Sequence, residues 1–79
     1  MIRVYFFGPI AEQIGTRELS LAFFSGMKLQ DVATQLQTQY ALAYRLVSFI
    51  ALNNTQTRDL QRLLSDNDEI AFMAKFSGG

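Results

Sequence analysis

The sequence predicts an α+β protein in which a small mixed β-sheet packs on one main helix. Three observations support this fold class. Residues 2–7 and 69–76 alternate in hydropathy as strands do. Residues 29–40 carry apolar side chains at spacings of three and four, which is typical of an amphipathic helix. No linker or change in composition divides the 79 residues, so one domain over residues 1–79 is expected.

The first 24 residues predict two strands. Residues 2–7 place Ile2, Val4 and Phe6 on one side, which we expect to face a core. Gly8-Pro9 ends this strand, because proline has no amide hydrogen to donate to a sheet. Residues 11–14 predict one helical turn, and residues 16–24 predict a second strand.

The main helix is predicted from Leu29 to Tyr40. Its beginning is the weakest local fit in the chain, because Lys28 stands at the N-cap and a lysine side chain cannot accept the free amide hydrogens there. Asp31 in the first turn offsets this in part through the helix dipole.

The second half of the chain predicts three more strands. Residues 46–52 form a third strand that ends at Asn53-Asn54, and residues 55–57 form a short edge strand. Leu60, Leu63 and Leu64 are expected to anchor a helical turn to the core, and residues 69–76 form the last strand. Short, right-handed connections are satisfied if the first and last strands lie parallel at the centre. This arrangement is the ubiquitin-like β-grasp, in which the C-terminus leaves a central strand.

Composition excludes several kinds of function. The chain has no cysteine and no histidine, so neither a disulfide nor the commonest metal and acid–base side chain is available. The net charge is zero, which argues against a nucleic-acid partner. No signal peptide or membrane-spanning stretch is recognisable, and a soluble cytoplasmic protein is the default. The acidic residues Asp66, Asp68 and Glu69 are interpreted as a solvated turn, with no metal and no bound cofactor expected.

The chain ends on Ser77-Gly78-Gly79. A Gly-Gly end has no side chain to obstruct a narrow channel and can adopt backbone angles that other residues cannot. It therefore suits an extended tail, residues 76–79, that enters another protein's active site and has its carboxylate activated there. The alternative is an ordinary frayed terminus.

Several segments together resemble the small sulfur-carrier subunit of molybdopterin synthase, a MoaD-like protein. Val4-Tyr5-Phe6-Phe7 followed by residues 12–16 is similar to its opening strand, short helix and glycine. Ala51-Leu52-Asn53 resembles its third strand and turn, residues 66–72 resemble its approach to the tail, and Ser77-Gly78-Gly79 matches its ending. The chain departs from the family where Ala74-Lys75 replaces two prolines, Phe76 replaces a smaller apolar residue and Asn67 replaces a turn glycine.

The resemblance implies a function for the tail. An E1-like activating enzyme would use ATP to adenylate Gly79, and a sulfur donor would displace AMP to leave a C-terminal thiocarboxylate. The molybdopterin synthase large subunit, in a heterotetramer, would then receive the tail, and the sulfur would pass to a cyclic pyranopterin phosphate in molybdenum cofactor biosynthesis. Gly79 would carry the sulfur, Gly78 would keep the tail slender, and the catalytic side chains would belong to the partner.

The docking surface expected for these partners consists of Phe7, Met73, Phe76 and Ser77 beside the tail. The alternative for the three large residues is that they are core. Other functions also stay open: a sulfur carrier for thiazole synthesis, a ubiquitin-like protein modifier, or a β-grasp interaction module with an inert tail.

Overall fold

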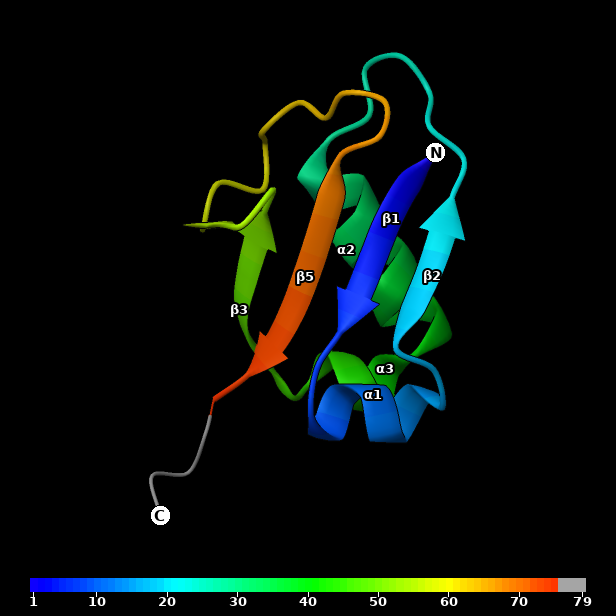
Figure 1. The fold of residues 1–79 in the computed structure, drawn as a ribbon, viewed down its shortest axis with the longest axis vertical. Helices are drawn as coiled ribbons and strands as arrows, with labels where there is room; N and C mark the ends of the chain where they lie inside the picture. Colours follow the sequence, from blue (N-terminus) through cyan, green and yellow to red (C-terminus); the bar gives the residue numbers. More distant parts are fainter. Residues whose placement is uncertain (76–79) are drawn as a thin grey trace.

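The computed structural model describes residues 1–75, which form a five-stranded mixed sheet with helices on one side (Figure 1). The elements are β1 (Ile2–Phe6), α1 (Pro9–Ile14), β2 (Glu18–Leu21), α2 (Leu29–Gln39), α3 (Ala41–Tyr44), β3 (Val47–Leu52), β4 (Thr55–Thr57) and β5 (Glu69–Ala74). The strand order is β2-β1-β5-β3-β4. β1 and β5 are parallel and the other neighbours are antiparallel. The predicted α+β β-grasp fold is confirmed.

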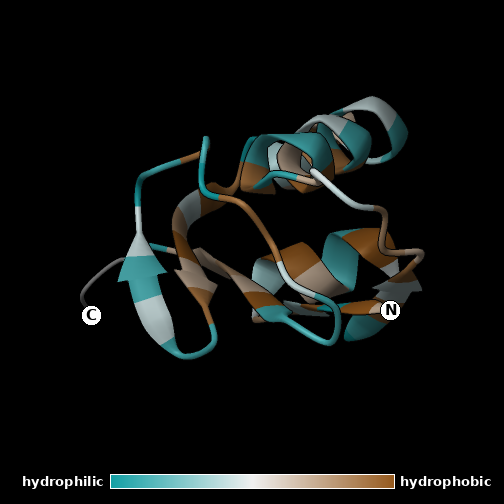
Figure 2. Cartoon of the chain, turned by 90° about the horizontal axis from the view of Figure 1, so that it is seen from above, coloured by the Kyte–Doolittle hydropathy of each residue, from teal (hydrophilic) through white to brown (hydrophobic). Residues whose placement is uncertain are grey.

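The core lies between the sheet and α2. Alternate residues of the two central strands are almost completely buried, and the rings of Phe6 and Phe72 stack with centroids 6.3 Å apart. α2 contributes the residues that the helical spacing predicted, namely Leu29, Val32, Ala33 and Leu36. Figure 2 shows hydrophobic residues through the middle of the molecule and hydrophilic residues in the surrounding loops. The inward side chains of the strands, which recur every second residue, therefore pack against the inward side chains of α2, which recur every three or four residues.

The unfavourable beginning of α2 is resolved by a distant segment. The amide of Leu29 donates to the carbonyl of Arg62 at 3.0 Å, and the amide of Gln30 donates to that of Leu60 at 2.8 Å. Asp31 accepts a hydrogen bond from the amide of Lys28 at 2.7 Å. The first free amides of the helix therefore have backbone acceptors, and the lysine at the N-cap does not need to supply one.

Two local predictions were wrong, and one short helix was missed. β2 ends at Leu21 instead of Phe24, because its last partner, Ile2, is the first residue of β1. Residues 60–64 do not form a helical turn. Their backbone runs beside the beginning of α2 and forms hydrogen bonds with it, and in this position Leu63 is 63% exposed while Leu64 is buried. The short helix α3 was not predicted at all.

The asparagine turns have the conformation that their residue types favour. Asn53, Asn54 and Asn67 have φ values of 49°, 70° and 72°, in the left-handed region that asparagine tolerates. Asn53 also joins two segments: its side chain donates to Asp68 at 3.0 Å and accepts from the amide of Glu69 at 2.9 Å. Among the helices of residues 1–75, none is long and apolar enough to cross a bilayer.

Candidate functional site

β5 directs the end of the chain away from the centre of the sheet. Its last residue, Ala74, lies opposite Val47 of β3, and Lys75 follows it as an exposed residue. The predicted site residues Phe76, Ser77, Gly78 and Gly79 lie outside the described residues, so their roles remain predictions.

The sheet surface opposite α2 is apolar near the point where β5 ends. We call it the outer face; its apolar members are Tyr5, Phe7, Phe49, Ala51, Ala71 and Met73. The register brings side chains from three strands into adjacent positions: Tyr5 lies opposite Ala71, and Phe49 opposite Met73. In the described residues this face has no helix over it, since the buried residues of α2 contact the other side (Figure 1).

Two of the predicted docking residues lie on this face. Phe7 is 51% exposed and follows β1 directly, where its amide donates to the carbonyl of Phe72 at 3.3 Å. Met73 is half-buried, one residue further along β5. The alternative that both are core residues is wrong for Phe7, which is exposed. Met73 lies between the two alternatives, because it is partly buried and partly exposed.

Phe49 is a further member of this surface that the sequence pattern does not identify. It is 36% exposed and lies opposite Met73. Strand alternation separates Phe49 from its neighbours Ser48 and Ile50, but it does not say which of the two sides faces solvent. Only the pairing of β3 with β5 identifies the exposed side.

A shallow hollow of about 220 Å³ indents the outer face. It is lined by Tyr5, Phe7, Ala51, Asn54, Glu69, Ile70 and Ala71. Polar groups close its far side: the hydroxyl of Tyr5 donates to Glu69 at 3.2 Å, and the guanidinium of Arg3 lies 3.5 Å from the same carboxylate. An apolar depression beside a polar rim is the usual anatomy of a protein-binding surface.

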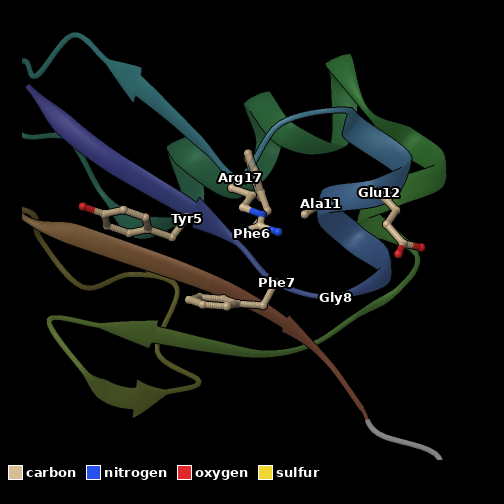
Figure 3. A pocket seen from close by; sticks show the side chains of 7 residues that line it. All are labelled: Tyr5, Phe6, Phe7, Gly8, Ala11, Glu12 and Arg17. Carbon is tan, nitrogen blue, oxygen red and sulfur yellow. The ribbon is translucent and has the colours of Figure 1, made fainter.

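A second hollow, of about 410 Å³, lies on the other side of the end of β1. Figure 3 shows Phe7 and Arg17 on either side of the strand end, with Glu12 on the outside of α1. Tyr5 and Phe7 line both hollows. Phe7 therefore stands as a ridge between two depressions, a position from which one side chain can contact a partner on both flanks.

The acidic turn is occupied by the protein's own groups. Asp66 pairs with the amino group of Met1, whose hydrogen bond holds the pKa of this carboxyl below its ordinary value. Asp68 accepts hydrogen bonds from the side chain of Asn53 and the amide of Ser65. Within residues 1–75 no group of three or more acidic side chains is placed to hold a metal ion. These contacts hold the conformation of the turn that leads into β5.

Comparison with known proteins decides the family. The ThiS family matches residues 4–79, which is nearly the whole chain. The chain belongs to the ThiS family. It is therefore a relative of the ThiS/MoaD ubiquitin-like β-grasp proteins, which are sulfur carriers or small modifiers. Among curated protein sequences, none gives a significant match.

Solved structures place this ThiS-family chain beside two kinds of relative. It is 32% identical to the small archaeal modifier protein 1 (SAMP1) of Methanosarcina acetivorans, with a TM-score of 0.79 over 99% of this chain and 95% of the other. It is 30% identical to a protein in the complex of subunits 1 and 2 of the molybdopterin-converting factor from Helicobacter pylori, with a TM-score of 0.71 over 99% and 97% of the two chains. SAMP1 of Haloferax volcanii, at 19% identity and a TM-score of 0.82 over 99% and 98%, supports the fold alone.

Proposed function

We propose that this ThiS-family chain is the sulfur-carrying small subunit of a molybdopterin synthase. The observation that carries the proposal is its similarity over 99% of its length to a protein that was solved in complex with subunit 2 of a molybdopterin-converting factor. The exposed apolar outer face beside the end of β5 supports it, because a carrier has to bind its partners close to its tail.

The chemistry takes place at the C-terminus. An activating enzyme transfers AMP from ATP to the carboxylate of Gly79, which converts a poor electrophile into an acyl group with a good leaving group. A sulfur donor at the sulfide level attacks this carbonyl carbon, AMP leaves, and a thiocarboxylate remains on Gly79. The large subunit receives the tail, the thiocarboxylate sulfur forms a bond to a cyclic pyranopterin phosphate, and water cleaves the bond between this sulfur and the Gly79 carbonyl carbon, which restores the carboxylate. Gly78 keeps the approach narrow, and the acid–base side chains are supplied by the partners.

Phe7, Met73 and Phe76 contribute the docking surface, and Phe49 is added to them by the pairing of β3 with β5. One apolar surface next to the tail allows the chain to engage the activating enzyme and the large subunit in turn. Both encounters require an exposed anchor, and Phe7 is the most exposed large residue of the outer face.

The test begins with the intact mass of the chain after incubation with ATP, a sulfur donor and the cognate activating enzyme. Replacement of one oxygen by sulfur, mapped to Gly79, is the expected result. The loaded chain should then convert a cyclic pyranopterin phosphate when the large subunit is added. Gly79→Ala is expected to fold normally and to lose sulfur transfer, with Lys75→Ala, at an exposed residue outside the docking surface, as the control that leaves the last two residues intact. Normal transfer by the Gly79→Ala protein would contradict the mechanism.

A second candidate is a protein modifier, which the 32% identity to SAMP1 of M. acetivorans favours. In that case the activated Gly79 carbonyl would be attacked by a lysine amine of a target protein, and an isopeptide bond would form as AMP leaves. The two candidates differ in their products. A thiocarboxylate consumed by the large subunit indicates the carrier, whereas higher-mass conjugates that resist denaturation indicate the modifier.

A further inference from the structure

Within residues 1–75, the edge of β3 nearest the end of β5 is open. β4 pairs only with Ile50, Ala51 and Leu52, whereas β5 pairs with β3 from Val47 onward. Among residues 1–75 no other backbone segment pairs with residues 47–49 on the side away from β5. Figure 1 shows this half of β3 at the margin of the sheet. The unpaired backbone groups of an edge strand are a template for another strand, so residues 47–49 offer a place for an extended chain.

A hollow of about 350 Å³ accompanies this open edge. Its lining combines apolar residues, among them Val47, Phe49 and Leu60, with polar residues such as Ser48 and Arg58. A strand that adds to a sheet edge gains affinity from backbone hydrogen bonds and specificity from pockets that take alternate side chains. The edge and the hollow together supply both requirements.

Ser48 limits how much of the edge can be used. Val47 lies opposite Ala74 and Phe49 lies opposite Met73, so Ser48 is an extra residue that forms a β-bulge. A bulge bends and twists its strand, which discourages long, flat pairing between unrelated edges. The open segment is therefore suited to a short partner strand, and Ser48 itself is exposed.

We propose that an extended segment of the enzyme that receives the tail pairs with β3 at residues 47–49. This rests on the proposed carrier function. Val47 is paired with Ala74, next to Lys75, so this edge begins beside the end of β5 and lies within reach of an enzyme that encloses the chain beyond Lys75. Phe49 lines the hollow and also belongs to the outer face, which makes the edge continuous with the proposed docking surface.

The direction of the added strand follows from the sheet. A segment antiparallel to β3 runs in the direction of β5, and thus toward the tail. One apolar side chain from the middle of this segment enters the hollow between Val47 and Leu60. The partner's active site then lies at the end of the added strand, where the tail arrives.

The proposal is tested by amide hydrogen exchange, measured by NMR on the isotope-labelled full-length chain alone and bound to the cognate large subunit. We expect exchange to slow by about tenfold or more in the complex at those amides of residues 47–49 that do not point toward β5. Ser48→Lys places a charge on the edge and is expected to weaken binding by about tenfold. Ser20→Lys is the matched control, because Ser20 is an exposed serine on β2, the strand at the opposite edge of the sheet.

The outcomes separate this proposal from the carrier function. Complex formation without slower exchange at residues 47–49, or equal binding by the Ser48→Lys and Ser20→Lys proteins, would overturn the edge proposal and leave the carrier function standing. Failure to form a thiocarboxylate, together with no binding to the large subunit, would overturn both. The exchange measurement uses the unaltered chain, so it decides the question even if Ser48→Lys does not fold.

Discussion

Truncation of Phe7 to alanine tests whether the outer face binds the partners. Phe7 is the ridge between the two hollows and is 51% exposed in the free chain. A partner can bury the half of the Phe7 ring that the fold leaves exposed to solvent. Phe7→Ala removes it without adding charge or bulk.

The size of the effect follows from the exposed area. A phenylalanine side chain buries about 150–250 Å² when it is fully covered, so roughly 100 Å² of Phe7 remains for a partner. At about 25 cal/mol per Å² this area is worth about 2.5 kcal/mol. Alanine retains a small share, which leaves a loss of about 2 kcal/mol, or about 30-fold in Kd. The covered half of the ring also contributes to folding, and we expect the free energy of unfolding to fall by about 1–2 kcal/mol.

Phe24→Ala is the control that separates these two effects. Phe24 is 53% exposed, almost the same as Phe7, but it lies in the loop between β2 and α2, at the end of the molecule opposite the end of β5 (Figure 1). Titration calorimetry with the cognate large subunit and with the activating enzyme should show weaker binding for Phe7→Ala alone. Urea unfolding should show similar, small losses for both variants. Equal Kd values for the two variants would refute the assignment of the outer face as the docking surface.

Three further predictions concern stability. Phe72→Ala opens a cavity at the centre of the core and is expected to cost about 3–5 kcal/mol of unfolding free energy in urea titrations; a loss below about 1 kcal/mol would contradict the packing described. Asp66 has a lowered pKa because its carboxylate accepts a hydrogen bond from the Met1 amino group, so its contribution is present above the ordinary pKa of 3.8 and is lost as the pH falls through the lowered pKa. Asp66→Asn should remove that part of the acid dependence of unfolding, and an unchanged pH profile would count against the pair. Asp31→Ala removes the acceptor for the Lys28 amide and should cost about 1 kcal/mol, seen as faster amide exchange in the first turn of α2; unchanged exchange there would mean that the backbone acceptors suffice.

Much of the fold was predictable from short-range patterns. Two patterns can be recognised within short stretches of the chain: the alternation of Ile2, Val4 and Phe6, and the helical spacing from Leu29 to Leu36. The apolar residues of both patterns are buried in the structure. The asparagine turns were also predictable, since the residue type itself tolerates the left-handed conformation. The tail chemistry predicted for Gly78 and Gly79 depends on sequence alone, and it remains a prediction.

Long-range pairing decided what these patterns could not. The start of α2 contradicts local propensity at Lys28, and it is satisfied by the carbonyls of Leu60 and Arg62, which are about thirty residues away in the chain. The same contact explains why Leu63 faces solvent, although its apolar character suggested an anchor.

The sequence by itself determined the order of the strands and the main helix, the core residues of β1 and α2, and the chemistry available at the C-terminus, because each depends on residue type and spacing. The tertiary structure decided which side of the sheet is covered. Periodicity divides a strand into two sides without saying which one meets α2. The exposed Phe7, its partnership with Met73 and Phe49, and the open edge at residues 47–49 exist only because β1, β5 and β3 lie side by side in one register.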